Sequence, residues 1–454
     1  MFLPSLVVRS RRVVTPRGTR PAAIHIRNER VIGVLDFDDV PPGCPLDDAA
    51  GAVIMPGVVD THVHAHGSGR GDSGFESATR AAAAGGITTL VEMPFPGPAT
   101  TMVAALEAKR RAAGGTCYVD VGFWGGVVPG NARDLAPLFE AGVLGFKCVL
   151  LPCAGDDFPP VSEDDLRIVM PALAKLGATL LAHAELAQPI ENARARQRLE
   201  RRWVDRIPGL SRASRRYATY LTGRPKEAEN EAIARLIQFC REHHTRTHAV
   251  HLSSSDALTP LFHARTARLP ITAETCPHYL YFVADEIADG TTSLTCAPPI
   301  RERANREFLW AALANGLIQM VVSDHAAEPR DGRCGLPSLQ LSLPVTWTGA
   351  RARGYTLDQL ANWMCLAPSQ LAGLSRKGRI DVGYDADLVV LDPDAEFTVE
   401  RLSLPQRDQQ TPYLGRRLRG VVERTYLRGR NVYSRGDGLT LTSPYGTLLS
   451  RDPT

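Results

Sequence analysis

The sequence predicts an α/β protein: a (β/α)8 TIM barrel with a small discontinuous β-sandwich domain formed by the N- and C-terminal segments. Three observations predict this fold. Between Val58 and Asp324, short apolar runs alternate with Ala- and Leu-rich helical stretches, as in βα repeats with a parallel sheet. Eight such runs can be counted, and eight βα units close a barrel. On both sides of this region, short β-type pieces are separated by Gly, Pro, Asn and Asp instead.

The chain is therefore expected to divide into one large and one small domain. We expect residues 1–55 to form the first part of the β-sandwich and residues 56–376 to form the barrel. Residues 377–434 return to short β-type pieces, and they are expected to complete the sandwich because both β-rich ends flank the same barrel. Residues 435–454 are expected to be a loose C-terminal tail.

The expected strands of the barrel follow in order along the chain. They end near His64, Glu92, Val127, Lys147, His183, His251, Thr275 and Asp324. Helical stretches lie between them, for example residues 77–84 and 228–242, and further helices are expected over residues 357–371. In barrels of this type, the residues at the C-terminal ends of the strands build the active site. Five of the eight expected ends carry a histidine, a lysine or an aspartate.

Composition excludes several classes of protein. A hydrophobic content of 44% and a charged content of 22% are ordinary for a globular protein and do not indicate disorder. A net charge of +3 is too small to predict a nucleic-acid or membrane-surface partner. No apolar run has the length of a membrane span, and the short apolar segment at the N-terminus does not fit a signal peptide. The nine cysteines include no CxxC pair, which favours reduced thiols and a cytoplasmic location.

The most informative motif is the pair His62 and His64 at the end of the first expected barrel strand. Side chains two residues apart on a strand project from the same face, so the two imidazoles can bind one metal ion. An isolated HxH pair is weak evidence for a metal site. Here Lys147, His183, His251 and Asp324 each end an apolar run of their own. Taken together, the six residues predict a metal centre.

Lys147 is the deciding residue of this set. The chain has only five lysines, and this one ends an apolar strand, where a bare ammonium is costly to bury. One interpretation is a salt bridge to a buried carboxylate. The other is a lysine whose deprotonated amine has added carbon dioxide to form a carbamate (N6-carboxylysine). The two carbamate oxygens would then bridge two metal ions.

In the second interpretation, His62 and His64 hold one metal together with Asp324, and His183 and His251 hold the other. Nitrogen and oxygen donors without thiolate suit zinc first, and manganese or cobalt as well. Two divalent ions bring the pKa of a bridging water toward neutrality and polarise a carbonyl group. Asp324 would take the proton of that water and deliver it to a leaving nitrogen. The expected reaction is hydrolysis of an amide.

The remaining histidines near strand ends are not included in the metal set. His248 points away from His251 if the strand is regular. His278 and His325 are likewise assigned to packing or to hydrogen bonds with the ligands. His66 lies beyond the strand, in a loop.

The chain resembles the cyclic amidohydrolases of the amidohydrolase superfamily, most closely the allantoinases. The resemblance covers nearly the full length and includes residues 56–64 (PGVVDTHVH), 85–89 (GGITT), 92–94 (EMP), 145–148 (GFKC), 183–185 (HAE), 251–254 (HLSS), 276–279 (CPHY), 298–301 (PPIR), 323–325 (SDH), 377–380 (KGRI) and 411–415 (TPYLG).

The resemblance implies a specific reaction and site. Members of the family use an HxH pair, a carbamylated lysine, two further histidines and an aspartate around two metal ions, and these match the six residues above. The implied activity is opening of the hydantoin ring of allantoin to allantoate, in purine catabolism. Backbone groups at Ala297 and about Cys334 would hold the ring amide, and Arg70 is a further candidate for substrate binding. Relatives are commonly oligomeric, so a homodimer or homotetramer is expected.

Two departures from the allantoinase pattern keep other functions open. After the HxH pair, residues 65–70 read AHGSGR, where relatives usually show a Glu-Pro-Gly stretch. Ala326 and Ala327 stand where allantoinases generally carry serine and proline. Lost hydroxyl contacts change substrate preference without changing the metal site. The alternatives are a hydantoinase or dihydropyrimidinase, another cyclic imide or ureide hydrolase, and a non-catalytic scaffold. A substrate panel distinguishes the enzymatic alternatives from one another, and metal analysis distinguishes an enzyme from the scaffold.

Overall fold

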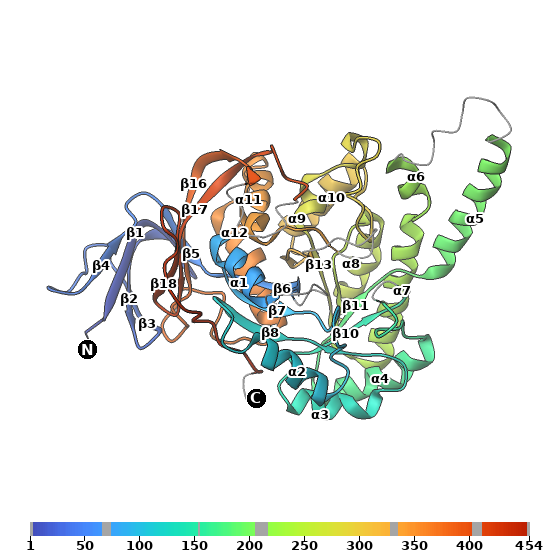
Figure 1. The fold of residues 1–454 in the computed structure, drawn as a ribbon, viewed down its shortest axis with the longest axis horizontal. Helices are drawn as coiled ribbons and strands as arrows, with labels where there is room; N and C mark the ends of the chain where they lie inside the picture. The colour runs from blue at the N-terminus through green and yellow to red at the C-terminus, as the bar shows by residue number, and fades with distance from the viewer. Residues whose placement is uncertain are drawn as a thin grey trace.

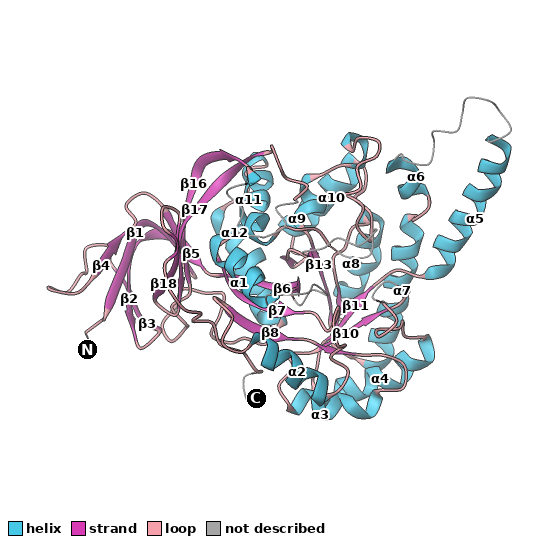
Figure 2. Ribbon diagram, in the orientation of Figure 1, coloured by secondary structure: helices cyan, strands magenta, loops and turns pink. Residues whose placement is uncertain are grey.

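The computed structural model describes residues 3–65, 74–152, 155–204, 217–326, 335–401 and 411–451. Two groups of strands, one at the ends of the chain and one in its middle, organise the fold (Figure 1). Figure 2 shows that helices surround the second group, whereas the first group forms a β-rich domain to one side of it.

Parallel strands from the middle of the chain form the barrel. In chain order they are β6 (Val58–His64), β7 (Ile87–Glu92), β8 (Asp120–Phe123), β9 (Gly125–Gly126), β10 (Phe146–Val149), β11 (Leu180–His183), β12 (Thr247–Ala249), β13 (Ile271–Thr275), β14 (Met320–Val321) and β15 (His325–Ala326). Hydrogen bonding links them as β15-β6-β7-β8 and as β9-β10-β11-β12-β13-β14. The chain itself continues from β8 into β9 and from β14 into β15, which closes the ring.

The barrel strands form where the sequence has short continuous apolar runs. Every residue of β6, β7, β10 and β11 is buried, as expected for parallel strands covered on both faces. The expected ends at His64, Glu92 and His183 coincide with the observed ends of β6, β7 and β11. The predicted α/β barrel with a separate β-rich domain is confirmed.

Helices follow the strands and cover the barrel. They are α1 (Gly74–Ala84), α2 (Val103–Ala113), α3 (Leu135–Glu140), α4 (Glu163–Leu176), α5 (Ala187–Val204), α6 (Tyr217–Thr222), α7 (Lys226–His243), α8 (Leu258–Thr266), α9 (Pro277–Tyr281), α10 (Arg303–Ala314), α11 (Ser342–Ala352), α12 (Leu357–Ala361) and α13 (Ala367–Leu371). Local sequence sets their ends: at α4, Ser162 and Asp165 form a capping box, and Gly177 ends the helix in the left-handed conformation. A π-helical turn at residues 362–366 joins α12 to α13. No helix among the described residues is both long and apolar enough to span a membrane.

The two ends of the chain share one sheet. Its strands are β1 (Leu6–Thr15), β2 (Gly18–Arg27), β3 (Arg30–Leu35), β4 (Leu46–Asp48), β5 (Val53–Pro56), β16 (Leu388–Thr398), β17 (Arg417–Leu427), β18 (Arg430–Ser434) and β19 (Gly438–Leu439). The strand order is β19-β18-β17-β16-β5-β1-β2-β3, and β4 pairs with β1. Antiparallel pairing of β16 with β5 joins the C-terminal part to the N-terminal part. The strands form one continuous sheet of nine, with an apolar core of their own.

The segment expected to be a loose tail is docked along residues 445–449. The N–H groups of Gly446 and Leu449 donate to the carbonyls of Cys117 and Val121, and the Val121 N–H donates to Thr447. The expectation of a loose tail is therefore wrong for these residues. The pairing uses backbone groups, which apolar periodicity does not reveal.

Candidate metal centre

The six predicted ligands lie at one rim of the barrel. His62 and His64 are at the end of β6, Lys147 is in β10, and His183 is the last residue of β11. His251 follows β12 by two residues, and Asp324 lies between β14 and β15. All six side chains belong to residues at most 5% exposed. Because parallel strands end at the same edge of a barrel, six positions far apart in sequence meet there.

The HxH pair and Asp324 form one possible metal-binding group. Oδ1 of Asp324 lies 3.3 Å from Nε2 of His62 and 3.8 Å from Nε2 of His64. The three side chains each offer one donor atom, and these atoms lie within 4.8 Å of one another. Two imidazole nitrogens and one carboxylate oxygen are a donor set that suits a divalent transition metal.

His183 and His251 form a second pair across the rim. Nδ1 of His183 lies 2.9 Å from Nε2 of His251, and their rings are in edge contact with centroids 4.6 Å apart. The His251 ring is also close to the His62 ring, with a centroid distance of 5.3 Å. The two groups of donors are therefore adjacent within one site.

Lys147 is the common electrostatic neighbour of the other five residues. Burial lowers the pKa of His62 to about 4, and the Lys147 charge contributes in the same direction against the opposing effect of Glu274. Burial and Lys147 also lower the pKa values of His64, His183 and His251. Burial raises the pKa of Asp324, which Lys147 opposes. Lys147 therefore acts electrostatically on all five side chains, and burial favours the neutral form of the four histidines, which is the form that binds a metal.

Hydrogen bonds fix the orientation of three of the four histidines. Nδ1 of His62 bonds to Oε1 of Glu274 at 2.6 Å, and Nδ1 of His64 bonds to the Phe95 carbonyl at 2.6 Å. In His183 the roles are reversed, because its Nε2 bonds to Oε2 of Glu185 at 2.9 Å. Each bond occupies one ring nitrogen as a donor and leaves the other nitrogen, which faces the neighbouring donors, with its lone pair.

Glu274 and Glu185 are functional positions that sequence reasoning missed. Glu274 also accepts a hydrogen bond from Nε2 of His248 at 3.0 Å, which places His248 behind the predicted ligands. Burial alone would raise the pKa of Glu274, but its hydrogen bonds and electrostatic interactions with His62 and His248 lower it well below its usual range. Arg224 donates to both oxygens of Glu185 at 2.8 and 2.7 Å and, against the effect of burial, lowers its pKa to about 2. The available signals in the sequence were a glutamate near the end of an expected strand, Glu274, and a glutamate two residues after a predicted ligand, Glu185.

Two of the predicted ligands have unusual backbone conformations. His251 has a φ of 40° and Asp324 a φ of 48°, in the left-handed region that residues other than glycine rarely adopt. Such positions cost about 1–3 kcal/mol each and persist only where the surrounding structure holds them. The Asp324 carbonyl accepts the N–H of Leu336 at 3.1 Å. A Cβ at Gly335 would lie 1.4 Å from that carbonyl oxygen, so only glycine allows this approach.

Asp324 has two further buried neighbours, Cys276 and His278. Their possible ligand atoms and that of Asp324 lie within 4.8 Å of one another. Neither ring nitrogen of His278 has a hydrogen-bond partner in the described part of the protein. His325 accepts the N–H of Ser338 on its Nδ1 at 3.1 Å. His278 therefore lies beside a predicted ligand, and His325 directly follows Asp324 in the chain.

Of the three predicted substrate contacts, Ala297 can be placed. It is 3% exposed and lies in the loop after β13. The carbonyl of the next residue, Pro298, accepts the hydroxyl group of Tyr279, whose ring contacts the His278 ring with centroids 4.2 Å apart, and His278 is a buried neighbour of Asp324. This loop therefore borders the metal centre. Arg70 and Cys334 lie outside the described residues, as does Ala327, whereas Ala326 is buried in β15.

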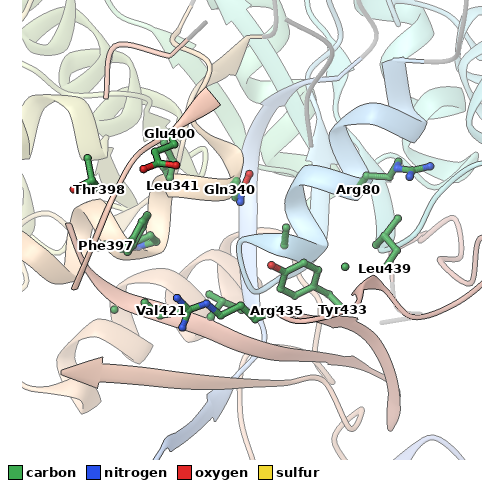
Figure 3. Close-up of a pocket in the computed structure, with 15 residues that line it drawn as sticks. Arg80, Gln340, Leu341, Phe397, Thr398, Glu400, Val421, Tyr433, Arg435 and Leu439 are labelled. Atoms are coloured by element: carbon green, nitrogen blue, oxygen red, sulfur yellow. The ribbon is translucent and has the colours of Figure 1, made fainter. Parts of the chain in front are cut away.

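A separate cavity of about 600 Å³ lies between α1 and the β-rich sheet. Figure 3 shows Arg80, Gln340 and Tyr433 among the side chains around it. None of the six predicted ligands lines it. Because those ligands are absent from its lining, this cavity is not the metal centre. Its two arginines, Arg80 and Arg435, are paired with Glu76 and Glu423.

Comparison with known proteins identifies the family. Residues 53–432 match the model of the Amidohydrolase family. The allantoinase of Streptomyces avermitilis is 45% identical to this chain over 99% of both proteins. The allantoinase of Arabidopsis thaliana is 39% identical over 97% of this chain and 90% of its own length. The L-hydantoinase (dihydropyrimidinase) structure from Arthrobacter aurescens superposes with a TM-score of 0.90 and 29% identity, covering 99% of this chain and 100% of that one. The chain belongs to the amidohydrolase family.

Proposed function

We propose that this protein is an allantoinase, which hydrolyses the cyclic amide bond of allantoin to give allantoate. Two observations together support the proposal. The chain is 45% identical over nearly its full length to an allantoinase, and all six residues expected to act meet at one barrel rim. The enzyme class is hydrolase acting on carbon-nitrogen bonds of cyclic amides.

The donor set fits two divalent ions. The described side chains fall into a group of two imidazoles and a carboxylate, and a pair of imidazoles, with Lys147 electrostatically close to both. Zinc is the first choice, with manganese or cobalt as alternatives. A carbamate on Lys147 would give the second group an oxygen donor and replace the lysine's positive charge with a negative one. When bound, the two ions would activate a water molecule near neutral pH and polarise the ring carbonyl.

The chain's own residues would do the remaining work. Asp324 would accept the proton of the attacking water and pass it to the leaving ring nitrogen. Its unusual backbone conformation and the Leu336 N–H on its carbonyl hold the carboxylate at the rim. The backbone N–H and C=O of Ala297 would hold the ring amide. Burial of all these groups excludes bulk water and strengthens each polar interaction.

A substrate panel tests the proposed function. Purified protein loaded with zinc in bicarbonate buffer is assayed in parallel with allantoin, hydantoin, dihydrouracil and dihydroorotate. A kcat/KM for allantoin well above the other three supports the proposal. Preference for hydantoin or dihydrouracil would instead support the hydantoinase or dihydropyrimidinase alternative, which the close fold of the Arthrobacter aurescens enzyme favours. Failure with all four rings and absence of bound metal would support a scaffold.

Three further properties belong to this proposal. A carbamate at Lys147 is tested by carbon-13 NMR after exchange with labelled bicarbonate. A homodimer or homotetramer is tested by light scattering on the purified protein. A cytoplasmic location is supported by the described cysteines, all of which are free thiols.

A further inference from the structure

The loop that carries Ala297 is held almost entirely through its carbonyl groups. Four of its carbonyls accept side-chain hydroxyl groups: Cys296 from Tyr220 at 2.6 Å, Pro298 from Tyr279 at 2.7 Å, Pro299 from Ser253 at 2.5 Å and Ile300 from Tyr217 at 3.1 Å. The Arg301 carbonyl accepts the N–H of Ala284. Four separate parts of the protein therefore fix this loop.

Ala297 is the exception in this run. It is buried, yet neither its N–H nor its carbonyl takes part in a hydrogen bond with any described residue. A buried backbone donor and acceptor without partners are costly, and ligands commonly supply the missing partners. The clamped carbonyls on both sides set the direction in which the Ala297 groups point.

The same short segment that clamps the loop also supports the metal centre. Tyr217 and Tyr220 lie on α6, and Arg224 follows two residues after this helix. Arg224 forms the two-fold ion pair with Glu185, which orients His183. The Arg224 carbonyl in turn accepts Nη1 of Arg301 at 2.9 Å, so the end of the loop is tied back to the segment.

We propose that residues 217–224 are a positioning element that holds both halves of the site: the substrate-binding loop through Tyr217 and Tyr220, and the His183 side of the metal centre through Arg224. The inference rests on the proposed function for its substrate half only. These residues act through the loop carbonyls and through Glu185 and do not themselves bind substrate or metal.

The substrate half is tested with Tyr220→Phe, which removes only the hydroxyl group. We expect KM for allantoin to rise about two- to tenfold, the effect of one hydrogen bond, while kcat and bound metal stay at the parent values. Tyr355→Phe is the matched control, because the Tyr355 hydroxyl bonds to the Trp310 carbonyl on an outer helix. An unchanged KM, or an equal rise in the control, would overturn the inference.

The metal half is tested with Arg224→Gln in the absence of substrate. We expect the weaker of the two zinc-binding steps, measured by competition with a chelator, to lose about ten- to a hundredfold in affinity. Arg428→Gln is the matched control, since Arg428 pairs with Asp120 at the start of β8, at the opposite end of the barrel. If Arg224→Gln does not fold, Glu185→Gln tests the same pair. Parent-like zinc affinity in the folded variant would overturn the inference.

The two failures can be told apart. A parent enzyme that does not hydrolyse allantoin overturns the proposed function alone. Zinc affinity is measured without substrate, and the KM test is repeated with whichever ring the enzyme opens.

Discussion

Glu274 holds His62 in place through a 2.6 Å hydrogen bond from Nδ1 of the imidazole to Oε1 of the carboxylate. The other ring nitrogen of His62 is thereby turned toward Asp324. The same carboxylate accepts a hydrogen bond from His248 and one from the backbone N–H of His251, at 3.3 Å. One buried carboxylate therefore connects the two groups of predicted ligands.

Replacing this carboxylate should weaken metal binding. Glu274→Gln keeps the size of the side chain, but a neutral amide does not have two ionised oxygens. It therefore cannot accept hydrogen bonds from both His62 and His248 as the carboxylate does. We expect about a ten- to a hundredfold loss of zinc affinity, as for other carboxylates that orient a ligand histidine. Competition with a chelator measures the zinc affinity. Glu307→Gln, which affects ion pairs with Arg306 and Arg353 and none of the predicted ligands, should bind zinc as the parent does. Equal affinities in all three proteins would contradict the role assigned to Glu274.

Asp324→Asn should abolish turnover while leaving metal content largely intact. The amide can still offer an oxygen to the metal, but it cannot accept a proton from the attacking water. The measurements are kcat with allantoin and metal per chain by elemental analysis. Appreciable activity in this variant would refute the proton-transfer role.

Lys147→Arg separates the two interpretations of the buried lysine. Arginine keeps the positive charge that a salt bridge needs, but it remains protonated and does not form a carbamate. We expect activity to fall by at least about a hundredfold, which corresponds to a few kcal/mol of lost transition-state stabilisation. Lys175→Arg on the exposed side of α4 is the control. Near-parent activity in Lys147→Arg would favour the salt bridge.

The Glu185–Arg224 ion pair predicts a dependence of stability on pH. The pKa of Glu185 is lowered from 4.5 to about 2, so its stabilisation is fully present above pH 4.5 and is lost as the pH falls toward 2. In metal-free protein, Arg224→Gln should lower the free energy of unfolding by roughly 3 kcal/mol at pH 7. The difference from the parent should narrow below pH 4.5.

Urea unfolding of the metal-free proteins at pH 7, 4.5 and 3 checks this. Arg353→Gln removes a partner of the half-exposed Glu307 and should change the free energy of unfolding far less. A difference between parent and Arg224→Gln that is the same at every pH would mean that the ion pair does not set the pKa of Glu185.

The barrel and the positions of the predicted ligands could be read from the sequence because both follow simple periodicities. His62 and His64 are two residues apart on a strand, and Lys147 and His183 end apolar runs. His251 follows the pattern of a ligand at the end of a strand only in part. It lies two residues beyond β12 in a left-handed conformation, which strand alternation does not describe.

The partners of the ligands could not be predicted in the same way. Glu185 is 39 residues from Arg224, and His62 is 212 residues from Glu274. Neither distance corresponds to a period of a helix or a strand. Which carboxylate meets which histidine depends on how the loops of neighbouring βα units pack, and the apolar pattern carries no information on this.

The docked C-terminal segment leads to a last prediction, on stability. Asp120, the first residue of β8, accepts the backbone N–H of Thr447 at 2.8 Å and the Nζ of Lys377 at 2.7 Å. Three backbone hydrogen bonds to Cys117 and Val121 extend the contact. Deleting residues 445–454 removes the Thr447 bond to Asp120 and the three backbone bonds, each worth about 0.5–1.5 kcal/mol, and leaves the Lys377 bond in place. We expect a loss of about 2–6 kcal/mol in the free energy of unfolding.

Thermal unfolding of the truncated and full-length chains measures the effect, and Thr447→Val, which removes only a hydroxyl group, should give a much smaller shift. Since Asp120 lies at the opposite end of the barrel from His62 and Asp324, kcat of the folded truncated enzyme should stay at the parent value. An unchanged unfolding temperature would mean that the docked segment contributes nothing to stability in solution. In its energetics the segment would then behave as a loose tail, although it is docked in the structure.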